Sequence, residues 1–418
     1  MAGPGSPEHP GPGPPAAADA VTLGRLVLPV YLPVIAGTIG VALLIPVLPL
    51  YLKDSGLSLG TTSVVLAAAG LGAALGSLPA GSSIARWGER RVLFAALLGL
   101  AVSTACLGVT TTVLALVALR MVAGGTNMAL RLSRQTYIAR RVPSERRGRA
   151  MAMIGGSFRL ALLVGPLLGG WSADTFGFTT TFVLAGACTA AGLVPPLFAG
   201  PHHLEPRTEL AVRQFGVVEG LRAHWRLLLV AGVVPFLVMT VREGRFVVLP
   251  LISDDLGLSP TAVGAVITVG TAADLLLFPA AGYVMDHFGR LWAMVPAFTL
   301  IAVGLVMLGV ADTTRSVVLA GAIIGIGNGL SSGTMLTFGS DLAPADATGP
   351  FLAGLAALQD GGRVVGPLLV GIVGAGAGLG AASLALAVVL VVAVVWLVTV
   401  VGETGNPADG RALASRRA

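Results

Sequence analysis

The phrases "AGSSIARWGERR" at residues 80–91 and "AGYVMDHFGRLW" at residues 281–292 are two copies of one pattern, and their spacing indicates the fold. Their glycines correspond one for one at an offset of 201 residues: Gly81 with Gly282, and Gly88 with Gly289. The charged positions do not correspond, since Asp286 stands where the first copy has Ala85. A repeated phrase that keeps its glycines and changes its charges therefore has to be explained.

The offset of 201 extends far beyond the phrase. It also relates Pro49 to Pro250, Asp54 to Asp255, Gly124 to Gly325, Asn127 to Asn328, Pro143 to Pro344, and "GPLLGG" at 165–170 to "GPLLVG" at 366–371. Such an ungapped register predicts a chain built from two similar halves in the same orientation. In membrane transporters, parallel halves place a substrate site near the middle of the bilayer between them.

Composition places the chain in a membrane. Of its 418 residues, 55% are hydrophobic and 11% are charged, and the mean hydropathy is +0.88. Soluble domains carry about 25% charged residues, so this chain lacks the polar surface that water requires. The 58 glycines suit close helix packing in lipid. The net charge of +6 could suggest nucleic acid, but the charges gather at membrane boundaries, so no nucleic-acid partner is expected.

Twelve apolar runs are long enough to cross a bilayer, which needs about 20 residues. They cover roughly 26–50, 61–84, 92–111, 113–138, 149–173, 178–199, 227–252, 260–285, 292–310, 316–340, 349–374 and 379–401. The predicted fold is an all-α membrane protein with twelve transmembrane helices in two parallel-repeat, six-helix halves. The predicted segments are a tail at 1–24, a first half at 25–200, a central loop at 201–226, a second half at 227–401 and a tail at 402–418.

Basic residues predict the orientation. Arginines fill the loops and ends on the side of the N-terminus, whereas Lys53 and Arg315 are the basic residues expected on the other side. Because Lys and Arg concentrate in cytoplasmic loops, both termini should be cytoplasmic and the protein should be a multi-pass protein of the cell membrane. The Pro- and Gly-rich tail should be disordered, and "VVEGLRAHWR" at 217–226 could form a short amphipathic helix at the inner surface.

No cofactor or metal site is expected. Cys106 and Cys188 lie inside apolar runs without metal-ligand spacing. The pair His202 and His203 could bind a metal, but a solvated loop explains it better. An intramembrane enzyme is disfavoured, because HExxH and phosphate-loop patterns are absent from the sequence and no histidine lies within a predicted span.

The motifs resemble those of the major facilitator superfamily over about residues 25–401. The pattern G-x-x-x-D-x-x-G-R is complete in Gly282, Asp286, Gly289 and Arg290, and partial in Gly81 and Gly88. "IPVLPLYL" at 45–52 resembles the drug:proton antiporter branch, as does the helix-5 motif in Gly165, Pro166 and Gly169. Arg120 followed by two glycines resembles the helix-4 motif.

The resemblance implies a cytoplasmic latch in each half. In the family, the loop Arg pairs with the loop Asp and with an acid at the end of the following even-numbered helix, here Asp286, Arg290 and Asp341. At the offset of 201, the first half has Glu89 and Arg140, so the signs of the bridge are exchanged. Opposite charges still attract, and we predict a reversed latch that lacks the Asp. The alternative is that both residues are ordinary solvated charges.

Charges within the predicted spans indicate a polar cavity. Ten ionisable residues lie there: Arg120, Arg131, Arg134, Arg159, Arg242, Glu243, Arg245, Asp274, Asp360 and Arg363. Each is costly if it faces lipid. Arg120, Asn127, Arg131 and Arg134 share one face of their helix, and by the resemblance that helix lines the cavity. The predicted substrate-cavity residues are Arg120, Asn127, Arg131, Arg242, Arg245 and Asn328. Alternatively, Arg131 and Arg134 snorkel to the inner interface.

Depth along the helices suggests partners for these charges. At about 1.5 Å per residue, Arg120 and Glu243 lie nearly level, and Arg159 lies near the level of Asp274. The resemblance places the helices of Arg159 and Asp274 in contact across the two halves. These depths predict the interhelix pairs Arg120–Glu243 and Arg159–Asp274.

A proton-driven cycle is the predicted mechanism. The proton-coupling candidates are Glu243, then Asp274, and also Asp360, which can pair with Arg363 three residues later on its own helix. Protonation of a carboxylate would release an arginine for a substrate anion. Whether these pairs act as gates or only neutralise one another stays open at this stage.

The predicted function is secondary active transport of a small-molecule substrate, with proton-coupled efflux of a drug or metabolite. The excess of arginine within the spans favours a substrate with an anionic or strongly polar group. An importer or a carrier of lipid-like anions on the same fold is the alternative, and a receptor or scaffold without transport is a further class. The protein is expected to be a monomer.

Overall fold

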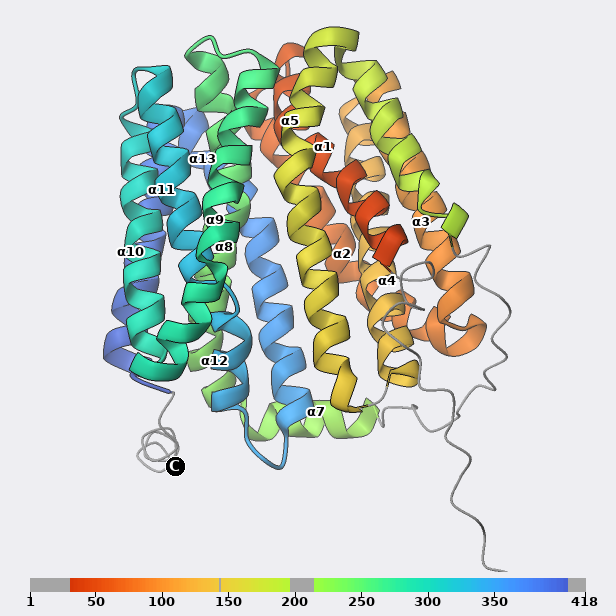
Figure 1. Cartoon of the computed structure of the whole chain (residues 1–418), viewed down its shortest axis with the longest axis vertical. Helices are drawn as coiled ribbons and strands as arrows, with labels where there is room; N and C mark the ends of the chain where they lie inside the picture. Colours follow the sequence, from red (N-terminus) through yellow and green to blue (C-terminus); the bar gives the residue numbers. More distant parts are fainter. Residues whose placement is uncertain (1–30, 143, 196–213, 405–418) are drawn as a thin grey trace, which may run out of the picture.

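A computed structural model describes residues 31–142, 144–195 and 214–404, which form helices and contain no β-strand (Figure 1). In chain order the helices are α1 (Leu32–Asp54), α2 (Leu59–Trp87), α3 (Glu89–Cys106), α4 (Val113–Arg141), α5 (Ser144–Ala191), α7 (Gln214–Ala223), α8 (Trp225–Asp255), α9 (Pro260–Phe288), α10 (Arg290–Gly309), α11 (Thr314–Leu330), α12 (Thr334–Leu342) and α13 (Thr348–Trp396). The expected N-terminal tail and residues 201–213 of the central loop lie outside the described residues.

The internal repeat is visible in the helix boundaries. The helix α2 spans 59–87 and α9 spans 260–288, so both ends keep the offset of 201. Ser58 caps α2 by accepting a hydrogen bond from the backbone of Thr61, and Ser259 caps α9 in the same way. Three pairs of glycines with positive φ also share the offset: Gly56 and Gly257, Gly88 and Gly289, Gly177 and Gly378. The duplication read from the sequence is therefore present in the backbone.

Nine helices within the described residues are long and apolar enough to cross a membrane. Two of the nine, α5 and α13, are each two helices joined at a glycine, Gly177 or Gly378, whose φ and ψ are not helical. The predicted runs five and six thus share α5, and runs eleven and twelve share α13. The tenth run is broken at 331–333 between α11 and α12, so its prediction as one continuous helix is wrong. The helical membrane class is confirmed, while the count of twelve spans remains a prediction.

Glycines set the packing within each half. An added Cβ on Gly124 of α4 would collide with the carbonyl oxygen of Ala69 on α2. The equivalent glycine of α11, Gly325, would collide with the carbonyl oxygen of Gly270 on α9. Both pairs keep the offset of 201, so the two halves bring their second and fourth helices together at the same backbone contact.

The two halves contact each other away from the face that carries α7 (Figure 1). On α5 and α9, Gly170 lies against the carbonyl of Pro260, and Gly264 lies against that of Pro166. On α13, Gly371 lies against Ser63 of α2. These contacts are close enough that a methyl group at any of the three glycines would force the helices apart.

Polar contacts close the same end of the molecule. Lys53 at the end of α1 forms ion pairs with Asp254 and Asp255 at the end of α8, with a distance of 2.6 Å from its Nζ to Oδ1 of Asp255. Asp174 of α5 accepts a hydrogen bond of 2.8 Å from the backbone N–H of Thr261. Both contacts join one half to the other at the face opposite α7.

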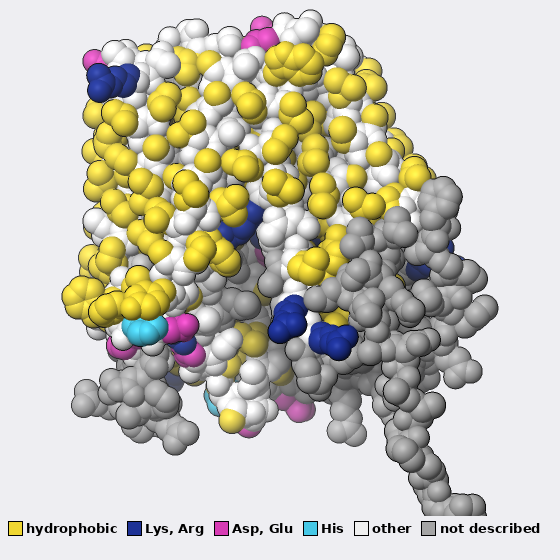
Figure 2. Space-filling model, in the orientation of Figure 1, with side chains coloured by type: hydrophobic (Ala, Val, Ile, Leu, Met, Phe, Trp, Pro, Cys, Tyr) yellow, Lys and Arg dark blue, Asp and Glu magenta, His cyan; other side chains and the backbone are white. Residues whose placement is uncertain are grey.

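Toward the α7 face the halves diverge. An added Cβ on Gly155 or Gly156, in the first part of α5, would meet no atom within 4 Å, and the same holds for Gly282 of α9. Figure 2 shows a hollow between the halves in this part of the molecule, with basic side chains in and beside it. The structure is therefore closed at the face opposite α7 and open toward the α7 face.

The outer surface suits a bilayer. Hydrophobic side chains cover the sides of the molecule (Figure 2), and Leu78 and Leu276 are each 79% exposed. Exposure of this many large apolar side chains would be unfavourable in water, so the belt is expected to contact lipid.

Candidate functional site

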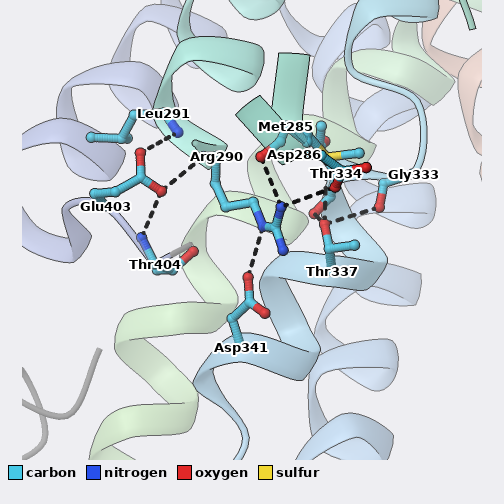
Figure 3. A network of polar contacts seen from close by, with 10 residues as sticks. All are labelled: Met285, Asp286, Arg290, Leu291, Gly333, Thr334, Thr337, Asp341, Glu403 and Thr404. Atoms are coloured by element: carbon cyan, nitrogen blue, oxygen red, sulfur yellow. Dashed lines mark hydrogen bonds and ion pairs between the residues drawn. The ribbon is translucent and has the colours of Figure 1, made fainter. Parts of the chain in front are cut away.

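The loop between α9 and α10 holds the complete signature pattern, and Arg290 organises it (Figure 3). Its Nε donates to Oδ2 of Asp341 at 2.9 Å, and its Nη1 donates to the carbonyl oxygen of Met285 at 3.0 Å. Asp286 lies farther away, 3.9 Å from Nη1 to its Oδ1, and its side chain is largely exposed. Gly289 precedes Arg290 with φ of 98°, a conformation that favours glycine.

Glu403, which follows the last helical turn, caps the start of α10 (Figure 3). Its carboxylate accepts hydrogen bonds from the backbone N–H groups of Arg290, at 2.8 Å, and Leu291, at 2.9 Å. A carboxylate at this position satisfies two free N–H groups and complements the helix dipole. It also offsets Arg290, whose positive charge is unfavourable in the first turn of a helix.

Replacing Glu403 with glutamine should loosen the first turn of α10. The loss of a charged cap costs about 1 kcal/mol, so the amides of Arg290 and Leu291 should exchange with solvent about fivefold faster in hydrogen-exchange mass spectrometry. The matched control is Asp286→Asn, which removes a nearby carboxylate that caps nothing and should leave these amides unchanged. Equal exchange in wild type and Glu403→Gln would contradict the capping role.

The first half holds the pair with exchanged signs. The distance from Nη1 of Arg140, at the end of α4, to Oε2 of Glu89, at the start of α3, is 3.1 Å. The Glu89 side chain is only 10% exposed, so it is not an ordinary solvated charge. Gly88 has φ of 83° and accordingly repeats the turn of Gly289. The pair is present, and its action as a latch remains a prediction.

Gly81 and Gly282 differ from the other signature glycines. Neither has positive φ, and an added Cβ on either would meet nothing within 4 Å. Nothing in this conformation therefore requires glycine at these two positions.

An alternating chain of charges crosses the hollow from one half to the other. Oδ2 of Asp360 on α13 lies 3.5 Å from Nη2 of Arg131 on α4, and its Oδ1 lies 3.4 Å from Nε of Arg363. Nε of Arg363 lies 3.8 Å from Oε1 of Glu243 on α8. We call Arg131, Asp360, Arg363 and Glu243 the bridging network. The bridging network joins the two halves beside the hollow.

The prediction of an ion pair between Arg120 and Glu243 is wrong, because Glu243 belongs to the bridging network. Among the ion pairs of the described residues, Glu243 is joined to Arg363 and not to Arg120. Rise along a helix gives depth but not direction around the axis, so level residues can still point apart. Arg131 binds Asp360 across the hollow, which differs from the alternative of a side chain that only snorkels to the interface.

A second polar cluster joins α5 of the first half to α9 of the second. Nη1 of Arg159 lies 3.6 Å from Oδ1 of Asp274, the pair expected from depth. Nδ2 of Asn328 donates to Oδ2 of Asp274 at 2.5 Å. Arg159 also donates to the Ser332 hydroxyl and lies over the ring of Phe278, 3.9 Å from its centroid.

The break between α11 and α12 takes part in this cluster. The backbone of Gly333 adopts the left-handed conformation, with φ of 80° and ψ of −19°, and two serines precede it. Nη2 of Arg242 on α8 donates to Oγ of Ser331 at 2.9 Å. Interrupted helices in transporters often form ligand sites, because their freed polar groups can face a cavity.

A small cavity of about 40 Å³ lies among α8, α9 and α11. Its polar lining comes from Arg245, Thr271 and Asp274, and Phe246 and aliphatic side chains supply the rest. The Arg245 guanidinium lies 4.7 Å from the ring centroid of Phe246. In this conformation the cavity has room for water and not for an organic molecule.

Arg120 and Arg245 are interior arginines that lie outside the salt bridges. Within the described residues neither takes part in an ion pair, although Glu243 lies near enough to attract both, and the buried Nε of each has no hydrogen-bond partner. Asn127, expected on the same face as Arg120, is exposed. A buried guanidinium group that lacks a salt bridge is costly unless an anion or water meets it.

The helix-5 motif lies at a helix junction and not at a ligand. Gly165 and Gly169 let α5 approach α1, at Ala42 and at the carbonyl of Leu43. The carbonyl of Pro166 meets Gly264 of α9 in the other half. The motif therefore packs one helix against its own half and against the partner half at once.

The comparisons with known proteins agree with this architecture. The family model described as Major Facilitator Superfamily matches residues 34–241 and again 231–417, once for each half. The chain belongs to the major facilitator superfamily. The resemblance of its signature residues to that superfamily is thereby confirmed, and relatives with drug-resistance names support the drug:proton branch.

Relatives within the superfamily include drug-resistance proteins. The chain is 25% identical to multidrug resistance protein 2 of Bacillus subtilis (strain 168) over 57% of its own length and 61% of the relative's. It is 27% identical to the class C tetracycline resistance protein of Escherichia coli over 81% and 88%. The crystal structure of a mutant of the nucleoside transporter NupG superposes with a TM-score of 0.73 at 13% identity, over 90% of this chain and 98% of that one. This last likeness concerns the superfamily fold alone.

Sequence reasoning missed three contributors to the site: Ser331, Ser332 and Glu403. A Ser-Ser-Gly run at 331–333 inside an apolar stretch is a signal for a helix break, and it could have been read. Glu403 carries no local signal, because its partners lie 112 and 113 residues earlier in the chain. Within the described residues, no group of three His, Cys, Asp or Glu side chains is placed to hold a metal ion.

Proposed function

We propose that the protein is a proton-coupled exporter of small organic molecules that carry an anionic group, and that it works by alternating access. The observation that carries this proposal is the bridging network, which links the halves through ion pairs beside a hollow that contains unpaired arginines. An importer, or a carrier of lipid-like anions, is the second candidate on the same site. The superfamily and fold are those of transporters, and catalysis is not part of the proposal.

Alternating access is supported by the distribution of glycines. At the closed end, glycines of α5, α9 and α13 lie in contact with the other half. At the open end, the same helices and α2 carry glycines with no neighbour within 4 Å: Gly81, Gly155, Gly156, Gly282 and Gly349. We infer that these bare glycines pack against the other half when the open end closes. That would also explain the glycines at 81 and 282, which this conformation leaves unexplained.

An anionic substrate is supported by the charge balance. Seven arginines and three acids lie in the predicted spans, and Arg245 lines the cavity beside Asp274 without an ion-pair partner of its own. A substrate anion beside Arg245 would supply the missing negative charge. A lipophilic cation would instead meet an uncompensated positive field.

Direction and location are proposed from the relatives and from the arginine distribution. Multidrug and tetracycline resistance proteins are among the relatives, which favours efflux. The concentration of arginines on the α7 side favours a cell-membrane protein with cytoplasmic termini, so the hollow would open to the cytoplasm. We expect a monomer, because each chain contains both halves of the proposed pathway.

Proton movement in liposomes tests the proposal. Purified protein is reconstituted with a pH dye inside, and matched anionic, cationic and neutral compounds are added outside. Anionic compounds should evoke a pH change, whereas cationic and neutral ones should give the signal of empty liposomes. Substrate uptake without any pH change would reject proton coupling, and a response confined to cations would reject the anionic substrate. Protein-free liposomes and an ionophore-collapsed gradient are the controls.

A further inference from the structure

A groove lies on the side of the first half, among α2, α3 and α4, apart from the proposed transport pathway. It holds about 1060 Å³ of space, part of it open to the outside. Its walls are mostly small or apolar side chains, and Trp87 and Arg91 stand at its end near the α7 face. The lining residues are Gly76, Pro79, Ala80, Ser83, Trp87, Arg91, Val92, Ala95, Ala96, Val122, Gly125, Thr126 and Ala129.

The groove faces the bilayer. On α4 it is lined by Val122, Gly125, Thr126 and Ala129. At about 100° per residue, these positions centre on the side of the helix opposite Arg131, which points across the hollow to Asp360. The groove therefore opens to lipid acyl chains and not to the transport pathway.

Charge complementarity selects the occupant. Arg91 is exposed and takes part in no ion pair within the described residues. The guanidinium of Arg86 lies 5.9 Å from the ring centroid of Trp87. An arginine without a protein partner at the end of an apolar groove matches a molecule with hydrocarbon chains and a negatively charged head. A tryptophan at that level is typical of the membrane interface.

The second half serves as an internal comparison, because the same helices recur at the offset of 201. Leu277, Pro296 and Ile326 stand where the groove has Gly76, Ala95 and Gly125. The basic positions 86, 90 and 91 become His287, Leu291 and Trp292. Larger side chains stand at these positions, and the arginines are absent from them. The small wall residues and the basic end thus occur together in the first half and do not follow from the duplicated fold alone.

We propose that this groove binds a diacyl phospholipid with an anionic headgroup, acyl chains along the apolar walls and phosphate at Arg91. Small residues make room for the chains, and Arg91 selects the charge of the head. A lipid held here would pack α2, α3 and α4 together beside the loop of Gly88 and Glu89. The site is independent of the transported substrate.

Native mass spectrometry of the full-length protein in detergent tests the proposal. Dioleoyl phosphatidylglycerol and dioleoyl phosphatidylcholine are titrated separately against wild type, Arg91→Gln and Ala95→Phe. Wild type should bind the phosphatidylglycerol more tightly. Arg91→Gln should weaken that binding about fivefold, since one arginine at an anionic lipid surface contributes about 1 kcal/mol. Ala95→Phe fills the groove and should reduce binding of both lipids.

Two matched controls separate the groove from general effects. Arg226→Gln removes an exposed arginine beside an exposed tryptophan, Trp225, with no groove next to it. Val102→Phe adds bulk at an exposed position of α3 that does not line the groove. Equal losses in Arg91→Gln and Arg226→Gln would overturn the proposal, and so would unchanged binding in Ala95→Phe. Elution as a single species in size-exclusion chromatography shows that each variant is folded.

Discussion

Replacing Glu243 with glutamine is expected to abolish substrate-evoked proton movement in liposomes while leaving substrate exchange intact. Glutamine keeps the size of the side chain and cannot gain or lose a proton in this pH range. If Glu243 is the proton carrier, the variant should still swap labelled for unlabelled substrate across the membrane. Its net transport driven by a pH gradient should fall to the level of empty liposomes.

The geometry of the bridging network is the reason for choosing Glu243. It contacts Arg363 at 3.8 Å, and its side chain is 35% exposed, so water and protons from the hollow can reach it. Asp360 contacts both Arg131 and Arg363 and is 12% exposed. Protonating Glu243 would break one of the two ion pairs of Arg363, which would keep Asp360 and gain the capacity to meet an anion. Protonating Asp360 would break the link between the halves at the same time.

Asp360→Asn is the comparison that separates a proton carrier from a structural charge. This variant leaves Arg131 and Arg363 facing each other across the hollow without the carboxylate between them. We expect a cost of about 3 kcal/mol, the lower end of the range for a broken buried ion pair, because Arg131 is partly exposed. Exchange and proton-driven transport should both fall in this variant. If Glu243→Gln also loses exchange, or if it keeps its proton signal, then Glu243 is a structural partner of Arg363 and the carrier lies elsewhere.

Much of the architecture could be predicted because the same helix pattern occurs twice in the sequence. The offset of 201 predicts that α9 follows the bounds of α2, and it identifies Glu89 and Arg140 as a pair before any coordinate is known. Ion-pair partners that lie on different helices were harder to predict. Arg159 and Asp274 were found from depth because their helices pack directly, at Gly170 and Gly264. The link from Arg131 to Asp360 depends on how α4 and α13 rotate about their axes, which depth does not record.

The repeated loop keeps its glycines because the backbone conformation requires them. Its charges can change because an ion pair requires only opposite signs. Gly88 and Gly289 have positive φ, and a side chain there would be strained in either half. The bridge needs only opposite signs. In the first half Glu89 occupies the start of α3, where an acid is favourable. In the second half Arg290 takes that place, and Glu403 supplies the acid from the end of the chain.

Reversing both charges of the first-half bridge should restore the transport that either single reversal removes. Glu89→Arg places two positive charges in contact where Glu89 is 10% and Arg140 22% exposed, and Arg140→Glu pairs two negative charges. A broken buried pair costs about 3–5 kcal/mol, enough to lower transport more than about a hundredfold if the bridge stabilises one state of the cycle. The measurement is substrate-driven proton movement in liposomes for the wild type and the three variants.

The double reversal should recover most, but not all, of the wild-type rate. It rebuilds the attraction, yet it places an arginine in the first turn of α3, where the loss of a favourable acid costs about 0.3–1 kcal/mol. In the second half, the cap from Glu403 offsets that cost. Among the described residues, the double variant would have no corresponding acid to cap α3. The control is Lys53→Ala at the opposite face, which removes the exposed ion pairs to Asp254 and Asp255. It should lower transport far less than either single reversal does, because exposed pairs contribute about 0–1 kcal/mol each. A double variant at positions 89 and 140 worse than both single variants would show that the two charges do not act as a bridge.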